Sequence, residues 1–339
     1  MQTKYSFIML VLIFCSCKKD GANTSNTSNT NTNSPVDVYV AGYEYDGSNG
    51  TIAVAKYWKN GQATPITFGY FNSFANSIAV VNGEVYIAET TLGAAFWSSG
   101  GTVFFGGSSQ QSGTNSITVL GSTIYVAGYD YNGSVSVAKY WAWPFGPVGP
   151  GPGGAFLSLT DGTRNAMGNS VTVVGTDAYV AGYEHNGSGI SVAKYWKNTQ
   201  PIDLTDGTKS AVATSIVVVG SDIYIAGSEN KIAKYWKNGQ AITLPAGDTA
   251  TSIVVAGTDV YVAGVGNNVA KYWKNGQAIT LPGGTSATSI AIVGSDIYVA
   301  GYGYNGSVSV AKYWKNGVAI PLTDGTKNAS AASIVVVKR

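Results

Sequence analysis

Ionisable side chains are scarce in this chain, and most of them recur at fixed places. The 339 residues include 20 Lys and Arg, 18 Asp and Glu and a single histidine, His185. One histidine excludes a His-rich metal centre and argues against a Ser-His-Asp triad. We therefore expect no metal and no cofactor. The chemistry that stays open is that of carboxylates, lysines and tyrosines.

Two carboxylates that face one substrate are the smallest set that glycoside hydrolysis needs. The carboxylates that are neither turn residues nor part of a repeated motif are scattered along the chain: Glu44, Asp46, Glu89, Asp130, Glu184 and Glu229. Their spacing singles out no pair, so no catalytic residue is predicted. Enzymatic activity, including lyase or calcium-dependent chemistry, stays an open alternative.

Six lysines stand in a Lys-Tyr-Trp motif, and six acids come just before a second motif, Val-Tyr-Val-Ala-Gly. One copy has Ala95 in place of the lysine, and another has Thr123 in place of the acid. When each lysine is matched with the acid of the next copy, the two exceptions meet. The sequence thus predicts a ring of partly buried ion pairs between repeats. The predicted pairs are Lys56–Glu84, Lys139–Asp177, Lys194–Asp222, Lys234–Asp259, Lys271–Asp296 and Lys312–Asp37. The alternative is that these lysines extend into solvent.

These motifs are positioned by a repeat. The tyrosine of Val-Tyr-Val-Ala-Gly recurs at residues 39, 86, 125, 179, 224, 261 and 298. A period of this size indicates a solenoid or a propeller. In the copy at 287–322, tight Gly-Ser and Asn-Gly turns separate four short runs of strand character, which predicts four antiparallel strands. We name them a, b, c and d in chain order.

The copy number and the two ends of the repeat region define the architecture. Seven copies are present; the first lacks strand a, and residues 333–337 supply one. An open array would expose strand edges, whereas a ring closed by this C-terminal strand would not. We predict an all-β, seven-bladed β-propeller over residues 36–339, with four antiparallel strands per blade. Its architecture resembles that of kelch and WD-repeat propellers, although their signature motifs are absent and no specific characterised family is matched.

Loops that differ between copies are the expected place for a ligand. The b–c and d–a loops vary and should share one rim, which is rich in aromatic residues. Tyrosine combines flat apolar area with hydrogen bonding, which suits sugars and peptides. The predicted ligand-binding residues are Tyr43, Tyr45, Tyr129, Tyr131, Tyr183, His185, Tyr302 and Tyr304. The alternative is that these rings pack their own hairpins.

Two further regularities lie near this rim. A serine begins every strand a and either holds water or a polar ligand, or bonds to the neighbouring d–a loop; the serines are Ser77, Ser116, Ser170, Ser215, Ser252, Ser289 and Ser333. Three d–a loops carry Asp-Gly-Thr, with Asp161, Asp206 and Asp324. Asp-Gly is turn chemistry first, and one carboxylate per loop is weak support for calcium.

The N-terminal segment resembles that of a bacterial surface lipoprotein. Residues 1–17 contain Lys4, a short apolar run and the sequence Cys17-Lys-Lys-Asp, which looks like lipoproteins of the Bacteroidetes type. The apolar run is too short to span a membrane. The resemblance implies lipidation of Cys17 and an outer membrane lipoprotein on the cell surface or periplasmic face. Residues 18–35, rich in Asn, Thr and Ser, read as a disordered tether.

Net charge and composition narrow the partners. The formal net charge is +2, so no strong field attracts nucleic acid or acidic lipid. We expect a monomer that touches the membrane only through a lipid anchor. The favoured function is non-enzymatic binding or scaffolding, with a glycan, peptide or protein ligand on the b–c and d–a rim. The alternatives are a glycan-active hydrolase or lyase and a structural envelope protein.

Overall fold

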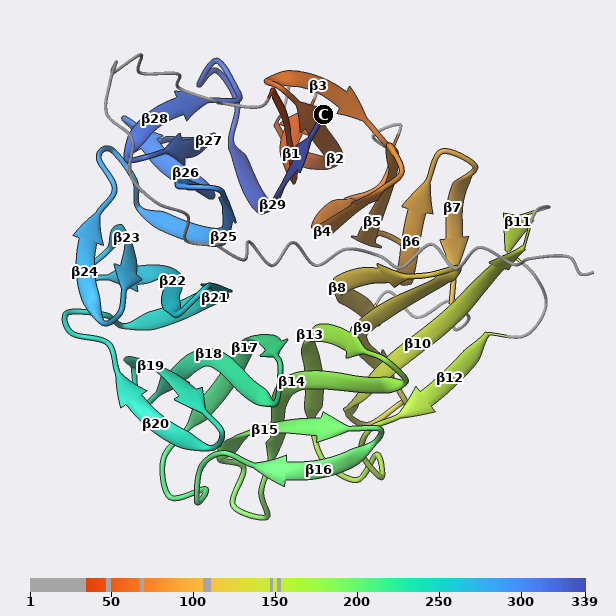
Figure 1. Ribbon diagram of the computed structural model, residues 1–339. Coiled ribbons are helices and arrows are strands. Elements are labelled where there is room, and N and C mark those ends of the chain that lie inside the picture. Colours follow the sequence, from red (N-terminus) through yellow and green to blue (C-terminus); the bar gives the residue numbers. More distant parts are fainter. Residues whose placement is uncertain (1–34, 47–49, 68–69, 106–110, 147–148, 151–153) are drawn as a thin grey trace, which may run out of the picture. The chain divides into compact units, whose positions relative to one another are not determined.

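The computed structural model describes residues 35–46, 50–67, 70–105, 111–146, 149–150 and 154–339. Their strands form seven sheets arranged in a ring about a common centre (Figure 1). The predicted seven-bladed β-propeller is therefore confirmed. The predicted targeting segment 1–17 with Cys17, and the predicted tether apart from Pro35, lie outside the described residues. Within those residues, no helix has the length and apolar character needed to cross a membrane.

Strand a is innermost and strand b follows it outward in every blade (Figure 1). From blade 1 to blade 7, the a strands are β29 (Ala329–Lys338), β4 (Phe74–Val81), β8 (Gly113–Leu120), β13 (Ala166–Val174), β17 (Ala211–Val219), β21 (Thr249–Ala256) and β25 (Ser286–Val293). The b strands are β1 (Val36–Asp46), β5 (Glu84–Thr90), β9 (Thr123–Tyr131), β14 (Asp177–His185), β18 (Asp222–Glu229), β22 (Asp259–Gly266) and β26 (Asp296–Asn305).

Strands c and d complete each blade on its outer side. The c strands are β2 (Ile52–Lys59), β6 (Ala94–Ser98), β10 (Ser136–Gly146), β15 (Ser191–Lys197), β19 (Ile232–Lys237), β23 (Val269–Lys274) and β27 (Val308–Lys315). The d strands are β3 (Gln62–Pro65), β7 (Gly101–Phe104), β12 (Ala155–Ser158), β16 (Gln200–Asp203), β20 (Gln240–Thr243), β24 (Gln277–Thr280) and β28 (Val318–Pro321). In blade 3, β11 (Gly149–Pro150) also pairs with the far end of β10.

The ring closes as the sequence predicted. The C-terminal strand β29 pairs antiparallel with β1, from Val36 opposite Lys338 to Glu44 opposite Ala329. An ion pair reinforces the junction: Arg339 Nε donates a hydrogen bond of 2.8 Å to Asp37 Oδ1. Hydrogen bonds from Arg339 and Asn60 hold the pKa of Asp37 at about 2.

Each strand a contains a β-bulge, and the extra residue comes directly before the serine that recurs in every blade. In β4, Ala75 pairs with Glu89 and Ser77 with Ala88, so Asn76 is the extra residue, and the other six a strands shift register at the same place. A bulge bends the strand and turns its side chains. Here it places the serine against the a strand of the next blade.

The serines form a closed set of seven hydrogen bonds between blades, which we call the serine ring. Each hydroxyl accepts from the backbone N–H that follows the equivalent serine in the next blade, at 3.2–3.4 Å. The donors and acceptors are Ile78 to Ser333, Ile117 to Ser77, Val171 to Ser116, Ile216 to Ser170, Ile253 to Ser215, Ile290 to Ser252 and Ile334 to Ser289. The partner is thus a strand, and the predicted bond to a d–a loop is replaced.

The bulge residues form a second set of bonds, which has six members. Each side chain donates to the carbonyl before the bulge of the next blade, at 2.7–3.0 Å. The donors and acceptors are Asn76 to Thr114, Asn115 to Gly168, Asn169 to Ala213, Thr214 to Ala250, Thr251 to Ala287 and Thr288 to Ala331. The seventh bulge residue is Ala332, whose side chain has no donor.

The core consists of seven apolar clusters, one at each contact between neighbouring blades. At the contact between blades 7 and 1, Trp58 and Val40 of blade 1 pack on Tyr298 and Tyr313 of blade 7. One face of each blade therefore presents its tryptophan to the preceding blade. The opposite face presents two tyrosines to the following blade, except in blade 2, where the pair is Tyr86 and Phe96.

The glycine of Val-Tyr-Val-Ala-Gly is required by the bulge. A Cβ atom on Gly42 would lie 2.1 Å from the carbonyl oxygen of Ser330, and one on Gly227 would lie 2.1 Å from that of Val212. Backbone contacts of this kind cannot be relieved by a side-chain movement. The motif thus pairs a glycine on strand b with the bulge on strand a in six blades, whereas blade 2 has Glu89 at this place.

Replacing Ala332 by threonine should complete the second set of bonds. The new hydroxyl would reach the carbonyl of Ala75, the position equivalent to those bonded in the other six contacts. We expect a gain of about 0.5–1.5 kcal/mol in the free energy of unfolding, measured by denaturant titration. Thr288→Ala, which removes an existing bond, should change stability by a similar amount in the opposite direction. A loss of stability in Ala332→Thr would contradict the assignment.

Candidate functional site

The predicted tyrosines of blades 7 and 1 come together on the rim formed by the b–c and d–a loops. Tyr43 and Tyr45 meet edge to face with ring centroids 5.8 Å apart, and Tyr302 and Tyr304 do so at 6.0 Å. Burial raises the pKa of Tyr43, and the nearby phenols Tyr45, Tyr302 and Tyr304 raise it further. The two pairs thus lie close enough to interact electrostatically, while Tyr43 itself packs edge to face on Phe74 of blade 2, with ring centroids 5.0 Å apart. Tyr304 is 56% exposed.

Two aromatic residues that the repeat comparison missed extend this group. Tyr70 and Phe71, in the d–a loop after β3, are 81% and 54% exposed. The loop is held beside Tyr45, because Asn72 Oδ1 accepts from the N–H of Ala53, which pairs with Tyr45 in the sheet. We call this set the aromatic arc: Tyr302, Tyr304, Tyr43, Tyr45, Tyr70 and Phe71. The loop does not align with other copies, and only its three aromatic residues in four positions could have marked it.

The other four predicted ligand-binding residues form a separate, less exposed group in blades 3 and 4. Tyr183 and His185 lie with centroids 5.7 Å apart. Burial raises the pKa of Tyr183, with a smaller effect of Tyr129. Tyr131 donates its hydroxyl to the carbonyl of Gly133, at 3.1 Å, across its own hairpin. This group matches the alternative in which the rings pack their own hairpins.

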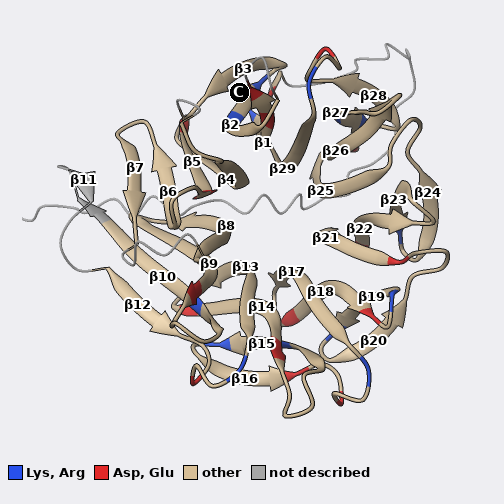
Figure 2. Ribbon diagram, turned by 180° about the vertical axis from the view of Figure 1, so that it is seen from behind, with Lys and Arg blue, Asp and Glu red and all other residues tan. Residues whose placement is uncertain are grey.

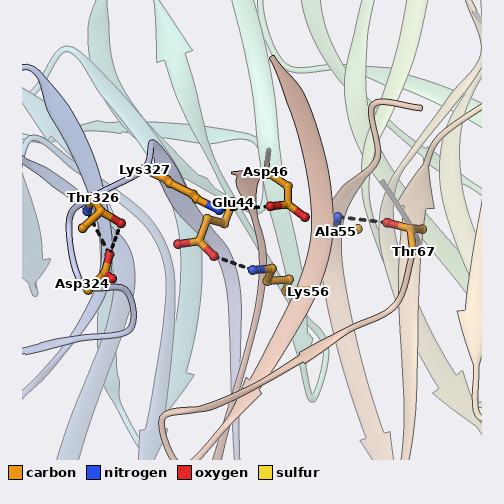
Figure 3. A network of polar contacts seen from close by, with 8 residues as sticks. All are labelled: Glu44, Asp46, Ala55, Lys56, Thr67, Asp324, Thr326 and Lys327. Carbon is orange, nitrogen blue, oxygen red and sulfur yellow. Dashed lines mark hydrogen bonds and ion pairs between the residues drawn. The ribbon is translucent and has the colours of Figure 1, made fainter. Parts of the chain in front are cut away.

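The prediction of inter-blade ion pairs is wrong, because the lysines bond within their own blade. Lys194 Nζ lies 2.7 Å from Glu184 Oε2 and 3.3 Å from Asp203 Oδ1. Lys139 lies 3.6 Å from Asp130, and Lys56 and Lys234 pair with Glu44 and Glu229. Figure 3 shows Glu44 reaching Lys56 beside a second pair, Asp46–Lys327 at 3.0 Å. The predicted partners Glu84, Asp177, Asp222 and Asp259 are not in these contacts.

The predicted pairs do not form because the lysine and the acid lie on blade faces that pack on different neighbouring blades. Lys56 shares a face with Trp58, and this face packs on blade 7. Glu84 belongs to blade 2 and lies on the face that carries Tyr86, which packs towards blade 3. Because side chains alternate along a strand, the two groups point away from one another around the ring. The match between the two exceptions, Ala95 and Thr123, was coincidental.

The acids before strand b pair instead with the second lysine of Lys-Tyr-Trp-Lys, in the same blade. The pairs are Lys59–Asp37, Lys197–Asp177, Lys237–Asp222, Lys274–Asp259 and Lys315–Asp296, at 2.8–3.5 Å. Each ammonium also lies 5.1–5.4 Å from the centre of the motif tyrosine. The second lysine is missing in blades 2 and 3, where the sequence has Ser98 and Ala142. In blade 3 the acid is missing as well, as Thr123, and this shared absence was the available signal; in blade 2 Glu84 remains and accepts from Ser99 Oγ at 2.9 Å.

Blades 6 and 7 hold their first lysine without a carboxylate. The d–a loops that lead into these two blades are short. Gly266 and Gly303 stand on strand b where blades 1, 3, 4 and 5 have the acid that pairs with the lysine. Lys271 Nζ donates to the carbonyls of Ala246 and Gly266 at 2.8 and 3.1 Å, and Lys312 Nζ donates to that of Gly283 at 2.9 Å. Burial lowers the pKa of Lys312. The predicted pairs Lys271–Asp296 and Lys312–Asp37 are therefore also wrong.

In blade 2 the charged residue of this pair of positions lies on strand b and not on strand c. Glu89 replaces the motif glycine, and it stands opposite Ala95, which replaces the lysine. The Glu89 side chain is fully buried, and it accepts hydrogen bonds from Ser73 Oγ at 2.6 Å and Thr102 Oγ1 at 3.1 Å. Burial raises the pKa of this carboxyl group, and these two hydrogen bonds oppose the shift.

Charged groups on the rim are mostly engaged with one another. Apart from Lys338, the a strands carry no charged residue, so charge lies further out on the blades (Figure 2). Asp161, Asp206 and Asp324 each accept from the backbone and hydroxyl of the threonine two residues later, which is turn chemistry. Within the described ranges, no three His, Cys, Asp or Glu residues converge as a metal site would require.

Comparison with known proteins supports the fold alone. No protein-family model matches the chain, and no curated protein matches it. Among solved structures, 145 chains are similar. One is the propeller of Dos1, with 9% sequence identity and a TM-score of 0.51 over 86% of this chain and 82% of that one. At this identity the likeness shows a propeller and carries nothing about a ligand.

A double-mutant cycle on Lys234 should separate the two pairings. Lys234 and Glu229 are only 17% and 19% exposed, so removing either partner leaves a shielded charge. We expect a coupling energy of about 1–3 kcal/mol between Lys234→Met and Glu229→Gln, measured from unfolding free energies. The cycle with Asp259→Asn is the control and should be additive within about 0.5 kcal/mol. Coupling to Asp259 alone would restore the inter-blade pair.

The pH dependence of stability should change when Glu89 becomes glutamine. Because the folded-state pKa of Glu89 is raised, its contribution is fully present at acidic pH and is lost as pH rises through that pKa. Glu89→Gln keeps a neutral group of the same shape. Its unfolding free energy relative to wild type should therefore increase from pH 4 to pH 8. The matched control Glu84→Gln, at an exposed residue, should show no such rise, and a variant disadvantage that grows with pH would refute the assignment.

Proposed function

We propose that the protein is a non-enzymatic, surface-tethered binding propeller that captures a glycan or peptide ligand on the aromatic arc. The observation that carries the proposal is the exposure of Tyr70, Phe71 and Tyr304, at 81%, 54% and 56%. Exposed aromatic rings that also carry hydroxyl groups provide contact area and hydrogen bonds at low entropic cost. The edge-to-face pairs Tyr43–Tyr45 and Tyr302–Tyr304 hold part of this surface rigid.

The state of the carboxylates favours binding over hydrolysis. Beside the arc, Glu44 is paired with Lys56 and Asp46 with Lys327 (Figure 3). A general acid in a glycosidase needs a raised pKa, and its partner must remain free to act as base or nucleophile. Glu89, the carboxyl group with the raised pKa, is fully buried and faces Ser73 and Thr102. The rim carboxylates serve the fold.

The point where the chain enters the ring suits a tethered receptor. Strand β1 begins at Val36 on the rim of the a–b and c–d turns, and Tyr45 is nine residues further along it. At about 3.3 Å per residue, the arc is about 30 Å from that entry. A lipid on Cys17 and a tether over 18–35 would therefore attach a monomeric ring by the rim opposite the arc. The outer membrane, at the cell surface or its periplasmic face, is the proposed location.

Alanine substitutions in the arc should abolish ligand binding without unfolding the ring. The full chain is applied to glycan and peptide arrays, and affinities for the ligands found are measured by titration. Tyr304→Ala and Phe71→Ala should each weaken binding at least tenfold, or about 1.4 kcal/mol. The control Phe156→Ala removes a ring of similar exposure, 49%, on an outer strand and should change affinity less than twofold.

Two outcomes would refute the proposal. One is that no glycan or peptide binds the full chain. The other is that a ligand binds with the same affinity to Tyr304→Ala, Phe71→Ala and Phe156→Ala, which would place its site away from the arc. Turnover of a bound glycan that depends on Glu44 or Asp46 would replace binding by hydrolysis as the function.

A further inference from the structure

Blade 1 has an open depression on the face that looks towards blade 2, on the rim opposite the aromatic arc. Its volume is about 430 Å³, which is within the range of about 300–1,000 Å³ found for small-ligand sites. Its walls come from strands β2 and β3 and from the turn between them. The lining residues are Tyr57, Lys59, Asn60, Gln62 and Thr64.

A single polar residue distinguishes this contact from the other six. Thr64 pairs with Tyr57 in the sheet, and in every other blade the residue at this place is aliphatic. The equivalents are Val103, Leu157, Ile202, Ile242, Ile279 and Ile320. Leu157 and Ile320 join the apolar clusters that contain the tryptophan of the next blade, Trp196 and Trp58. Val103 does the same with Trp141, whereas Ile202, Ile242 and Ile279, like Thr64, belong to none of these clusters.

The tryptophan that faces this contact is correspondingly less covered. Trp97 is half-buried, whereas the six other motif tryptophans are at most 3% exposed. Its ring centroid lies 6.0 Å from that of Tyr57, with the planes inclined at 40°. Tyr57, one of these two inclined rings, lines the depression, and Trp97 packs against Tyr57 from blade 2.

The polar groups around the depression are of the kinds that bind hydroxyl groups. Lys59 is 48% exposed and shares Asp37, at 3.5 Å, with Arg339, so its ammonium group keeps unused donors. Gln62 is exposed and Thr64 half-buried. Asn60 is committed to the fold, because its amide bonds to Asp37 and Val38. Amide, hydroxyl and ammonium groups beside aromatic rings can bond a polyol while packing on its C–H face.

We propose that the blade 1–2 depression is a second binding site, for a hexose oligosaccharide. A pyranose ring has an apolar face of C–H bonds that can pack on Tyr57 and Trp97, and hydroxyl groups at its edge for Gln62, Thr64 and Lys59. The site is separate from the aromatic arc, because Lys59 pairs with Tyr39 and Tyr45 lies six residues further along β1, about 20 Å away. Its occupation does not depend on the arc.

The test replaces Thr64 by isoleucine, the residue at the equivalent place in four other blades, so the fold should be kept. The full chain is applied to an array of hexose oligosaccharides, and the ligands found are titrated while tryptophan fluorescence is followed. Wild type should bind with a change in fluorescence. Thr64→Ile should weaken binding at least tenfold, and Gln62→Ala at least threefold. Gln240→Ala, the equivalent change in blade 5, and Tyr304→Ala in the arc should each change affinity less than twofold.

Each other outcome overturns the proposal. If no hexose oligosaccharide binds the full chain, the depression is not a sugar site. If binding is kept in Thr64→Ile and lost in Tyr304→Ala, the ligand belongs to the arc and the proposed function stands without the second site. If a peptide array yields a ligand that depends on Thr64 while the sugars do not bind, the class of ligand is wrong.

Discussion

The innermost strand of each blade has a free edge, and the way this edge is satisfied governs the rest of the ring. Strand a pairs with strand b on one side only, so backbone groups on the other side need partners. The serine ring answers this need once per blade, with a hydroxyl of one blade accepting from the backbone of the next. In six blades the strand b residue beside the bulge that aims the serine is the motif glycine, and in blade 2 it is Glu89. The serine, the bulge residue and this glycine thus all derive from one inner edge.

The two faces of a blade are different, and this difference explains the electrostatics. The face with the tryptophan packs on the preceding blade, and the face with the tyrosines packs on the following blade. Side chains on the two faces of one blade therefore cannot meet, even when their residues are close along the chain. Lysines of the motif therefore find partners across their own sheet, from strand b, or in the loop that arrives from the preceding blade. Where that loop is short, its carbonyl oxygens occupy the place of a carboxylate. Whether the first lysine of the motif has a carboxylate partner therefore follows the length of the d–a loop that leads into its blade.

The sequence alone was sufficient for the number of blades, the strand order and the closure, because these depend on turn residues and on alternation, which are local. It was insufficient for the lysine partners, since the direction in which a face looks is a property of the closed ring. The serines were recognised as a set, but the residue pattern does not show the direction in which a bulge turns a side chain, so their partner was misassigned. Tyr70 and Phe71 lie in a loop without counterparts, where comparing copies gives no help. Thr64 was visible as an exception among aliphatic residues, and only the incomplete burial of Trp97, across the contact from Tyr57, gave it meaning.

The serine ring repeats the same donor and acceptor at every contact, and this makes the blades interchangeable parts. A segment cut from one bulge to the next carries one complete donor and one complete acceptor, so its duplication or deletion would leave every inner hydrogen bond intact. Hydrogen bonding therefore does not count the blades. Any limit on the number of blades therefore lies in the apolar packing between the sheets, where the tryptophan of one blade packs on the aromatic pair of the blade before it.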